Sequence, residues 1–97
     1  MTYSLHRGAE LDVLEAARFY RKEGGAKLAN RFLNEFERVA ELLLRFPGIG
    51  TPADELRRGH PLQDFPYSVI YRANAGHIRV LVVRGHLRDP KHGESRR

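Results

Sequence analysis

Two apolar runs near the C-terminal end give the clearest pattern in the chain. Residues 65–72 and 77–84 are rich in β-branched and aromatic side chains, and the short stretch between them contains Asn74 and Gly76. Asn and Gly tolerate the positive φ that a tight reversal of the backbone requires. The pattern therefore predicts a β-hairpin, with residues 74–76 as its turn.

This turn implies a register in which Tyr71 lies opposite Arg79 and Val69 lies opposite Leu81. Because side chains alternate between the two faces of a strand, each face of the hairpin receives its own set. One face would carry Tyr67, Val69, Tyr71, Leu81 and Val83. The other face would carry Ser68, Ile70, Arg72, Ile78, Val80 and Val82. Both faces are substantially apolar, so both require cover.

Upstream of the hairpin, the apolar residues follow a helical spacing. Residues 2–7 alternate and predict a short strand. Helices are then predicted from Ala9 to about Lys22 and from about Ala26 to Arg45, with Gly24-Gly25 as the turn between them. The first apolar stripe contains Leu11, Leu14, Ala17 and Phe19, with Val13, Ala16 and Tyr20. The second contains Leu28, Phe32, Phe36, Val39, Leu43 and Phe46, and core packing explains both stripes.

The remaining segments complete the predicted topology. Residues 46–52 are dense in Pro and Gly and predict a loop, while residues 55–64 predict a strand at an edge or with a bulge. Residues 89–97 are expected to be a mobile tail. The order β-α-α-β-β-β predicts one α+β domain spanning residues 1–97. It would contain an N-terminal strand, an antiparallel helical hairpin on one sheet face and a three-stranded antiparallel run in a mainly antiparallel sheet.

A single pair of helices covers one face of such a sheet and leaves the other face open. The predicted register places Ile70, Ile78, Val80 and Val82 on the open face, beside Arg72. An exposed apolar patch with charged neighbours marks a partner site.

The composition narrows the chemistry. The chain has 97 residues, a formal net charge of +5 and no cysteine. The positive charge favours an anionic partner, although the arginines could also serve only to keep the surface solvated. The absence of cysteine excludes a disulfide framework, a thiolate metal site and a thiol nucleophile. No signal peptide or membrane-spanning run is apparent, so a cytoplasmic protein is expected.

Several segments together, in their order and spacing, resemble the RelE/ParE superfamily, the toxic halves of type II toxin-antitoxin pairs. They are Leu14–Tyr20, Ala29–Phe32, Leu42–Leu43, Phe46–Gly50, Glu55–Arg57, Phe65–Arg72, Val80–Val83 and Arg88–Pro90. The resemblance implies a cognate antitoxin, whose C-terminal segment wraps the toxin as a helix or an added strand. Such a segment would cover the apolar face formed by Ile70, Ile78, Val80 and Val82 with Arg72.

The superfamily contains two activities. RelE-like members cut mRNA in the ribosomal A site, whereas ParE-like members poison DNA gyrase and have no known catalytic centre. In the RelE type, an Arg follows the Tyr that opens the third strand, and a Tyr occurs in the C-terminal segment. Here Ser68 occupies the first position, and no tyrosine follows Tyr71. These departures favour a ParE-like, non-catalytic gyrase inhibitor.

Two sets of site residues follow from the two activities. For a ParE-like toxin, the target-binding candidates are Arg57, Arg58, Arg72, Arg84 and Arg88. The alternative is a metal-independent ribosome-dependent endoribonuclease, for which His86, His92, Arg72, Arg84 and Arg88, with Lys91, would supply acid, base and phosphate-binding cations.

No cofactor or metal is expected. His86 and His92 lack an evident third metal ligand. Direct DNA binding is also not expected, because the basic residues of the second helix alternate with glutamates. Any contact with DNA would come through the antitoxin.

Overall fold

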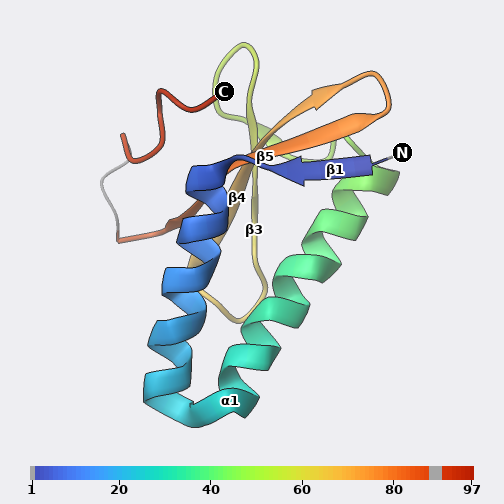
Figure 1. The fold of residues 1–97 in the computed structure, drawn as a ribbon. Coiled ribbons are helices and arrows are strands. Elements are labelled where there is room, and N and C mark those ends of the chain that lie inside the picture. Colours follow the sequence, from blue (N-terminus) through green and yellow to red (C-terminus); the bar gives the residue numbers. More distant parts are fainter. Residues whose placement is uncertain (1, 88–90) are drawn as a thin grey trace.

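The structure is a computed structural model, and it describes residues 2–87 and 91–97 of the chain. A long helix packs against one face of a sheet, as Figure 1 shows. In chain order the elements are β1 (Thr2–Leu5), α1 (Arg7–Arg45), β2 (Thr51–Pro52), β3 (Arg58–Pro61), β4 (Tyr67–Asn74) and β5 (His77–Gly85). The predicted α+β class is confirmed. Among the described residues, no helix is both long and apolar enough to cross a membrane.

The helical region forms one element where the sequence predicted two. α1 spans 39 residues, and only Gly24 (φ −144°, ψ 15°) and Gly25 (φ +79°, ψ −177°) leave the helical conformation. The backbone angles of Gly25 are essentially restricted to glycine, and the chain reverses direction there (Figure 1). The N-terminal limb (residues 7–23) and the C-terminal limb (residues 26–45) therefore join directly. One helix, kinked at these two glycines, therefore stands where the sequence predicted two helices and a turn, and its two limbs run in opposite directions (Figure 1).

The sheet is mixed rather than antiparallel, and its five strands follow the order β1-β5-β4-β3-β2. β1 pairs in parallel with β5, from Thr2 beside His77 to Leu5 beside Val80, whereas the other neighbouring strands are antiparallel. The parallel pair was not predicted, because the direction of β1 depends on where α1 returns the chain. β2 was also missed, since two residues carry no periodic signal.

The β4–β5 hairpin forms, but its turn is shorter than expected. Asn74 pairs with His77, so only Ala75 and Gly76 make the turn, and Gly76 has a φ of +74°. A two-residue turn of this kind is the commonest hairpin connection.

A β-bulge then changes the faces on which the β5 side chains lie. Val80 pairs with Tyr71 and Val82 pairs with Ile70, which leaves Leu81 without a partner residue. A slip of one residue moves side chains to the opposite face. The two-residue turn sets Ile78 opposite Ala73 and Val80 opposite Tyr71, so both lie in the core against α1, at 1% and 0% exposure. The bulge then leaves Leu81 with Ile70 and Val82 on the outer face. The predicted face of Ile78, Val80 and Leu81 was wrong.

The two limbs of α1 differ in how well their buried faces were predicted. The C-terminal limb buries Phe32, Phe36, Val39 and Leu43 from the predicted stripe. The N-terminal limb buries Val13 and Ala16 from its predicted stripe, together with Ala9 and Asp12, whereas Leu11, Leu14 and Phe19 are 52%, 50% and 52% exposed. The small alanines let this limb approach the sheet closely, and the larger leucines made the opposite face resemble the buried one.

Candidate functional site

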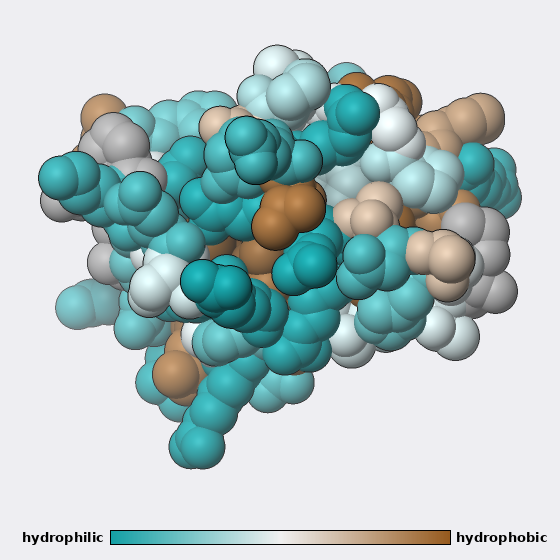
Figure 2. All heavy atoms as spheres, turned by 90° about the horizontal axis from the view of Figure 1, so that it is seen from above, coloured by the Kyte–Doolittle hydropathy of each residue, from teal (hydrophilic) through white to brown (hydrophobic). Residues whose placement is uncertain are grey.

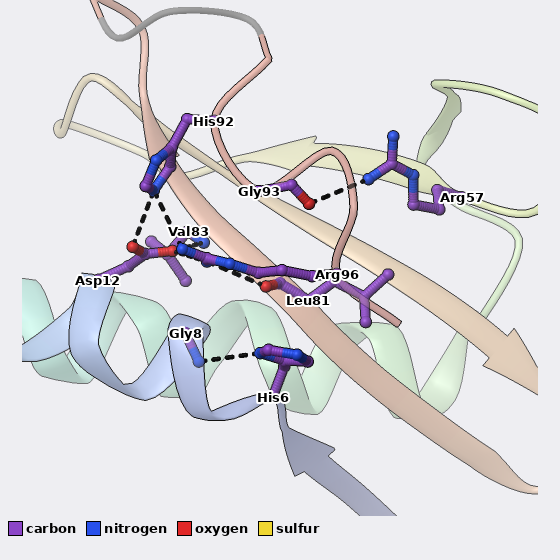
Figure 3. Close-up of polar contacts among 9 residues, drawn as sticks. All are labelled: His6, Gly8, Asp12, Arg57, Leu81, Val83, His92, Gly93 and Arg96. Atoms are coloured by element: carbon purple, nitrogen blue, oxygen red, sulfur yellow. Dashed lines mark hydrogen bonds and ion pairs between the residues drawn. The ribbon is translucent and has the colours of Figure 1, made fainter.

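Asp12 is a buried carboxylate that contacts His92, Arg96 and Val83 (Figure 3). It projects from the N-terminal limb of α1 and is 7% exposed. Its Oδ2 accepts hydrogen bonds from the Val83 backbone N–H (3.0 Å) and from Arg96 Nη1 (2.6 Å), and its Oδ1 lies 3.0 Å from His92 Nε2. One side chain thus connects α1, β5 and the C-terminal residues.

The pKa of Asp12 reflects this environment. Burial acts to raise the pKa, but the hydrogen bonds from Arg96, His92 and the Val83 N–H outweigh burial and hold it below its ordinary value. The carboxylate is therefore ionised at neutral pH and paired with Arg96.

The sequence analysis missed Asp12, although a signal was present. Asp12 lies three residues after Ala9 and four before Ala16, on the helical face that also carries Val13. A carboxylate at the centre of an apolar face requires a buried partner. Its partner Arg96 is 84 residues away in sequence, so only the fold identifies the pair.

The C-terminal segment (residues 91–97) lies against the outer face of the sheet. Arg96 Nη1 also donates to the Leu81 carbonyl (3.2 Å), and Arg57 Nη1 lies 3.5 Å from the Gly93 carbonyl oxygen. Gly93 has a φ of +77° and packs so closely on Val82 that a Cβ would overlap the Val82 side chain. These contacts give the segment a defined place, and its expected mobility stays a prediction.

The outer face is consequently not the open apolar surface that the sequence predicted. Leu81, Val82 and Ile70 are 1%, 0% and 4% exposed. The C-terminal segment contacts Val82 and the Leu81 backbone. Of the five predicted antitoxin contacts, Ile78 and Val80 lie in the core and Ile70 and Val82 are buried on the outer face, so Arg72 alone is partly exposed.

Four arginines line a narrow hollow beside this segment, which we call the arginine groove: Arg57, Arg72, Arg96 and Arg97. The groove has a volume of about 150 Å³, and its other lining residues are Asp54, Leu56, Leu81 and Glu94. A second hollow of about 360 Å³ shares Asp54, Leu56, Arg57 and Arg72 and adds Arg58. Figure 2 shows that the end of the molecule seen from above in Figure 1 is mostly hydrophilic, with a small apolar patch near its centre.

The arginines of the groove differ in their internal partners. Arg57 Nε lies 2.7 Å from Asp54 Oδ2, and Arg96 is paired with Asp12. Within residues 2–87 and 91–97, the guanidinium groups of Arg72 and Arg97 form no hydrogen bond or ion pair. Two cationic groups in the groove are therefore available to an external anion.

Arg58, another predicted target contact, has a structural role. Its Nη1 donates to the carbonyl oxygens of Gly50 (2.8 Å) and Gly48 (3.3 Å). The buried Tyr71 hydroxyl supports the same loop, since it donates to the Pro47 carbonyl (2.7 Å) and accepts from the Gly50 N–H (3.0 Å). Arg58 and Tyr71 together fix the loop that leads from α1 to β2.

His86 lies in a separate hollow of about 500 Å³ between the N-terminal limb of α1 and the end of β5. Its ring Nε2 is 3.0 Å from Ser68 Oγ, and its backbone N–H donates to the Pro66 carbonyl (2.8 Å). The lining residues are mainly apolar or aromatic, including Phe19, Tyr20, Tyr67 and Leu87, with Asp12 and Glu15 as acids. Burial and the neighbouring Tyr67 raise the pKa of Tyr20.

The structure places His86 and Arg72, two of the ribonuclease candidates, in different hollows. Among the described residues, the lining of the hollow with His86 includes no arginine, and that of the arginine groove includes no histidine. His92 is engaged with Asp12, and Arg84 is a half-buried residue of β5 with contacts of its own. Arg88 lies outside the described residues. Within the described part of the chain, no three His, Asp or Glu side chains form a group that could hold a metal ion.

A solved structure and a family model both match this chain. A solved structure titled "Chromosomal ParDE TA system from P. aeruginosa" matches this fold with a TM-score of 0.76 and 18% identity, over 88% of this chain and 95% of that chain. The two chains therefore share one fold, a kinked helix on a mixed sheet. A comparison with curated proteins gave no match.

The sequence itself identifies the family. Residues 3–90 match the family model described as "ParE toxin of type II toxin-antitoxin system, parDE". The chain therefore belongs to the ParE toxin family. This confirms the resemblance to the RelE/ParE superfamily and the prediction that the chain is ParE-like rather than RelE-like. Membership in this family implies an antitoxin as partner.

Proposed function

We propose that this ParE-type toxin inhibits growth by binding DNA gyrase in the cytoplasm, without catalysing a reaction of its own. Membership in the ParE family supports a toxin of this type, and the proposal adds gyrase as its target. The target contact would be the arginine groove, with Arg57 and Arg72 from the predicted set. A basic groove of this kind suits an acidic protein surface and speeds association with it.

The placement of His86 and Arg72 in different hollows is the observation that carries this proposal. Cleavage of RNA by its 2′-hydroxyl requires a base, an acid and cations around one phosphate. In the described residues, His86 and Arg72 line different hollows, and Asp12 engages His92. This arrangement supports binding over catalysis.

The test is to induce the chain in bacteria without an antitoxin and to assay the purified protein in two reactions. We expect inhibition of supercoiling by purified gyrase and intact mRNA on translating ribosomes. Arg72→Gln should weaken gyrase inhibition, whereas the matched control Arg21→Gln, which removes a charge from the exposed surface of α1, should not. Cleavage of mRNA in the ribosomal A site without gyrase inhibition would refute the proposal.

The double variant His86→Ala/His92→Ala separates the two activities further. A gyrase-binding toxin should keep its toxicity, because neither imidazole lines the arginine groove. Loss of toxicity with unchanged folding and antitoxin binding would instead support the ribonuclease alternative. Circular dichroism would check the folding of the variant, because His92 contacts the buried Asp12.

A further inference from the structure

We propose that the arginine groove binds an acidic side chain of the antitoxin. This side chain would lie on a peptide segment, next to an apolar residue. The proposal rests on the ParE family assignment, which implies an antitoxin, and not on gyrase as the target. It assigns recognition to Arg72, Arg97 and Leu56. Of these three, only Arg72 was among the antitoxin contacts that the sequence predicted.

The charge distribution defines the ligand. Arg72 and Arg97 have no internal partner among the described residues, while Arg57 and Arg96 are already paired with Asp54 and Asp12. Asp54 and Glu94 also line the groove, so its net charge is only moderately positive. A single carboxylate fits this mixture better than a phosphate with a charge near two, because the two acids repel the larger charge more strongly.

The size and the rim of the groove agree with this assignment. A volume of about 150 Å³ accommodates one side chain rather than a folded element. Leu56 lines both adjoining hollows and is 61% exposed, so it offers an apolar contact directly beside the cations. A peptide with neighbouring acidic and apolar side chains satisfies both features at once.

The C-terminal segment completes the site. Arg97 reaches the groove because Asp12 holds the preceding Arg96 and because Gly93 packs on Val82. Asp12 is therefore a positioning residue for this site, since it touches Arg96 and not the ligand. The groove is composite, as Arg72 comes from β4 and Arg97 from a segment that the fold places beside it.

The test is an NMR titration of the full ¹⁵N-labelled chain with a capped peptide of sequence Gly-Leu-Glu-Gly and with its Gly-Leu-Gln-Gly counterpart. We expect the glutamate peptide to bind about three- to fivefold more tightly, as exposed charge pairs contribute up to about 1 kcal/mol. The shifts should map to the amides of Leu56, Arg72 and Arg97. No gyrase or ribosome is present, so the result does not depend on the target of the toxin.

Matched variants complete the design. Arg72→Gln and Arg97→Gln should each remove the preference for glutamate, Leu56→Ala should weaken both peptides, and Arg21→Gln should leave binding unchanged. Equal affinity for the two peptides, equal loss in Arg21→Gln, or shifts elsewhere on the surface would overturn the proposal. Tighter binding of inorganic phosphate or of a short single-stranded oligonucleotide than of the glutamate peptide would also overturn it.

Discussion

Arg96 donates a hydrogen bond of 2.6 Å to the buried carboxylate of Asp12, and this pair joins the C-terminal segment to the first turns of α1. The side chain of Asp12 is 6% exposed and that of Arg96 is 17% exposed, so water screens the pair only weakly. His92 and the Val83 N–H complete the set of groups around the carboxylate. The pair therefore helps to hold the outer side of the sheet in place.

Removing the charge of Asp12 should destabilise the fold. We expect Asp12→Asn to lower the free energy of unfolding by about 2–3 kcal/mol, because Arg96 would stay largely buried without its counter-charge. Urea denaturation followed by circular dichroism measures the change. Glu10→Gln, an exposed neighbour on the same helix, is the control and should change stability by less than about 0.5 kcal/mol. A similar loss in both variants would argue against a special role for the pair.

The carboxylate of Asp12 should also make the stability of the fold depend on pH. The pKa of Asp12 is lower in the folded state than in the unfolded state, where it has its ordinary value of 3.8. As the pH falls below about 4, the unfolded chain takes up this proton first, so protonation favours unfolding. The stability difference between wild type and Asp12→Asn should therefore be full at neutral pH and shrink below about pH 4. A constant difference across this range would contradict the assignment.

The Tyr71 hydroxyl should stabilise the loop that follows α1. Tyr71→Phe removes the partner of the Pro47 carbonyl and of the Gly50 N–H, and should cost about 1–3 kcal/mol. Hydrogen exchange at the Gly50 amide should become faster in this variant. Tyr3→Phe provides a matched control, because the Tyr3 hydroxyl forms no hydrogen bond with another described residue. Unchanged exchange at Gly50 would contradict the role of Tyr71.

The burial of Val80 in the β4–β5 hairpin can be tested against an exposed apolar residue, Leu14 of α1. Val80→Asp should prevent folding, with a loss above about 4 kcal/mol, because Val80 is 0% exposed in the core. Leu14→Asp should change stability by less than about 0.5 kcal/mol, since Leu14 is 50% exposed on the outer side of α1. Thermal unfolding compares the two variants directly. A folded Val80→Asp variant would restore the register predicted from the sequence.

The sequence by itself determined the elements with strong local signals. The apolar runs on either side of Asn74 and Gly76 predicted the hairpin, and the stripe from Phe32 to Leu43 predicted the buried face of the C-terminal limb. Gly24-Gly25 marked the point where the helix reverses. These features depend on backbone preferences and on residues close together in the chain, so a sequence pattern records them. The order of its motifs also identified the superfamily.

The tertiary structure alone decided which faces meet and which side chains gather at a site. The two-residue turn placed Ile78 and Val80 on the core face of Tyr71, and the bulge at Ile70–Tyr71 placed Val82 on the opposite face, a change that alternation along a strand cannot reveal. The parallel pairing of β1 with β5 depends on the path of α1. The contact of Asp12 with Arg96 joins segments far apart in the sequence, and so does the groove that Arg72 and Arg97 line together. Long-range proximity comes from the packing of the whole chain, because no local preference specifies it.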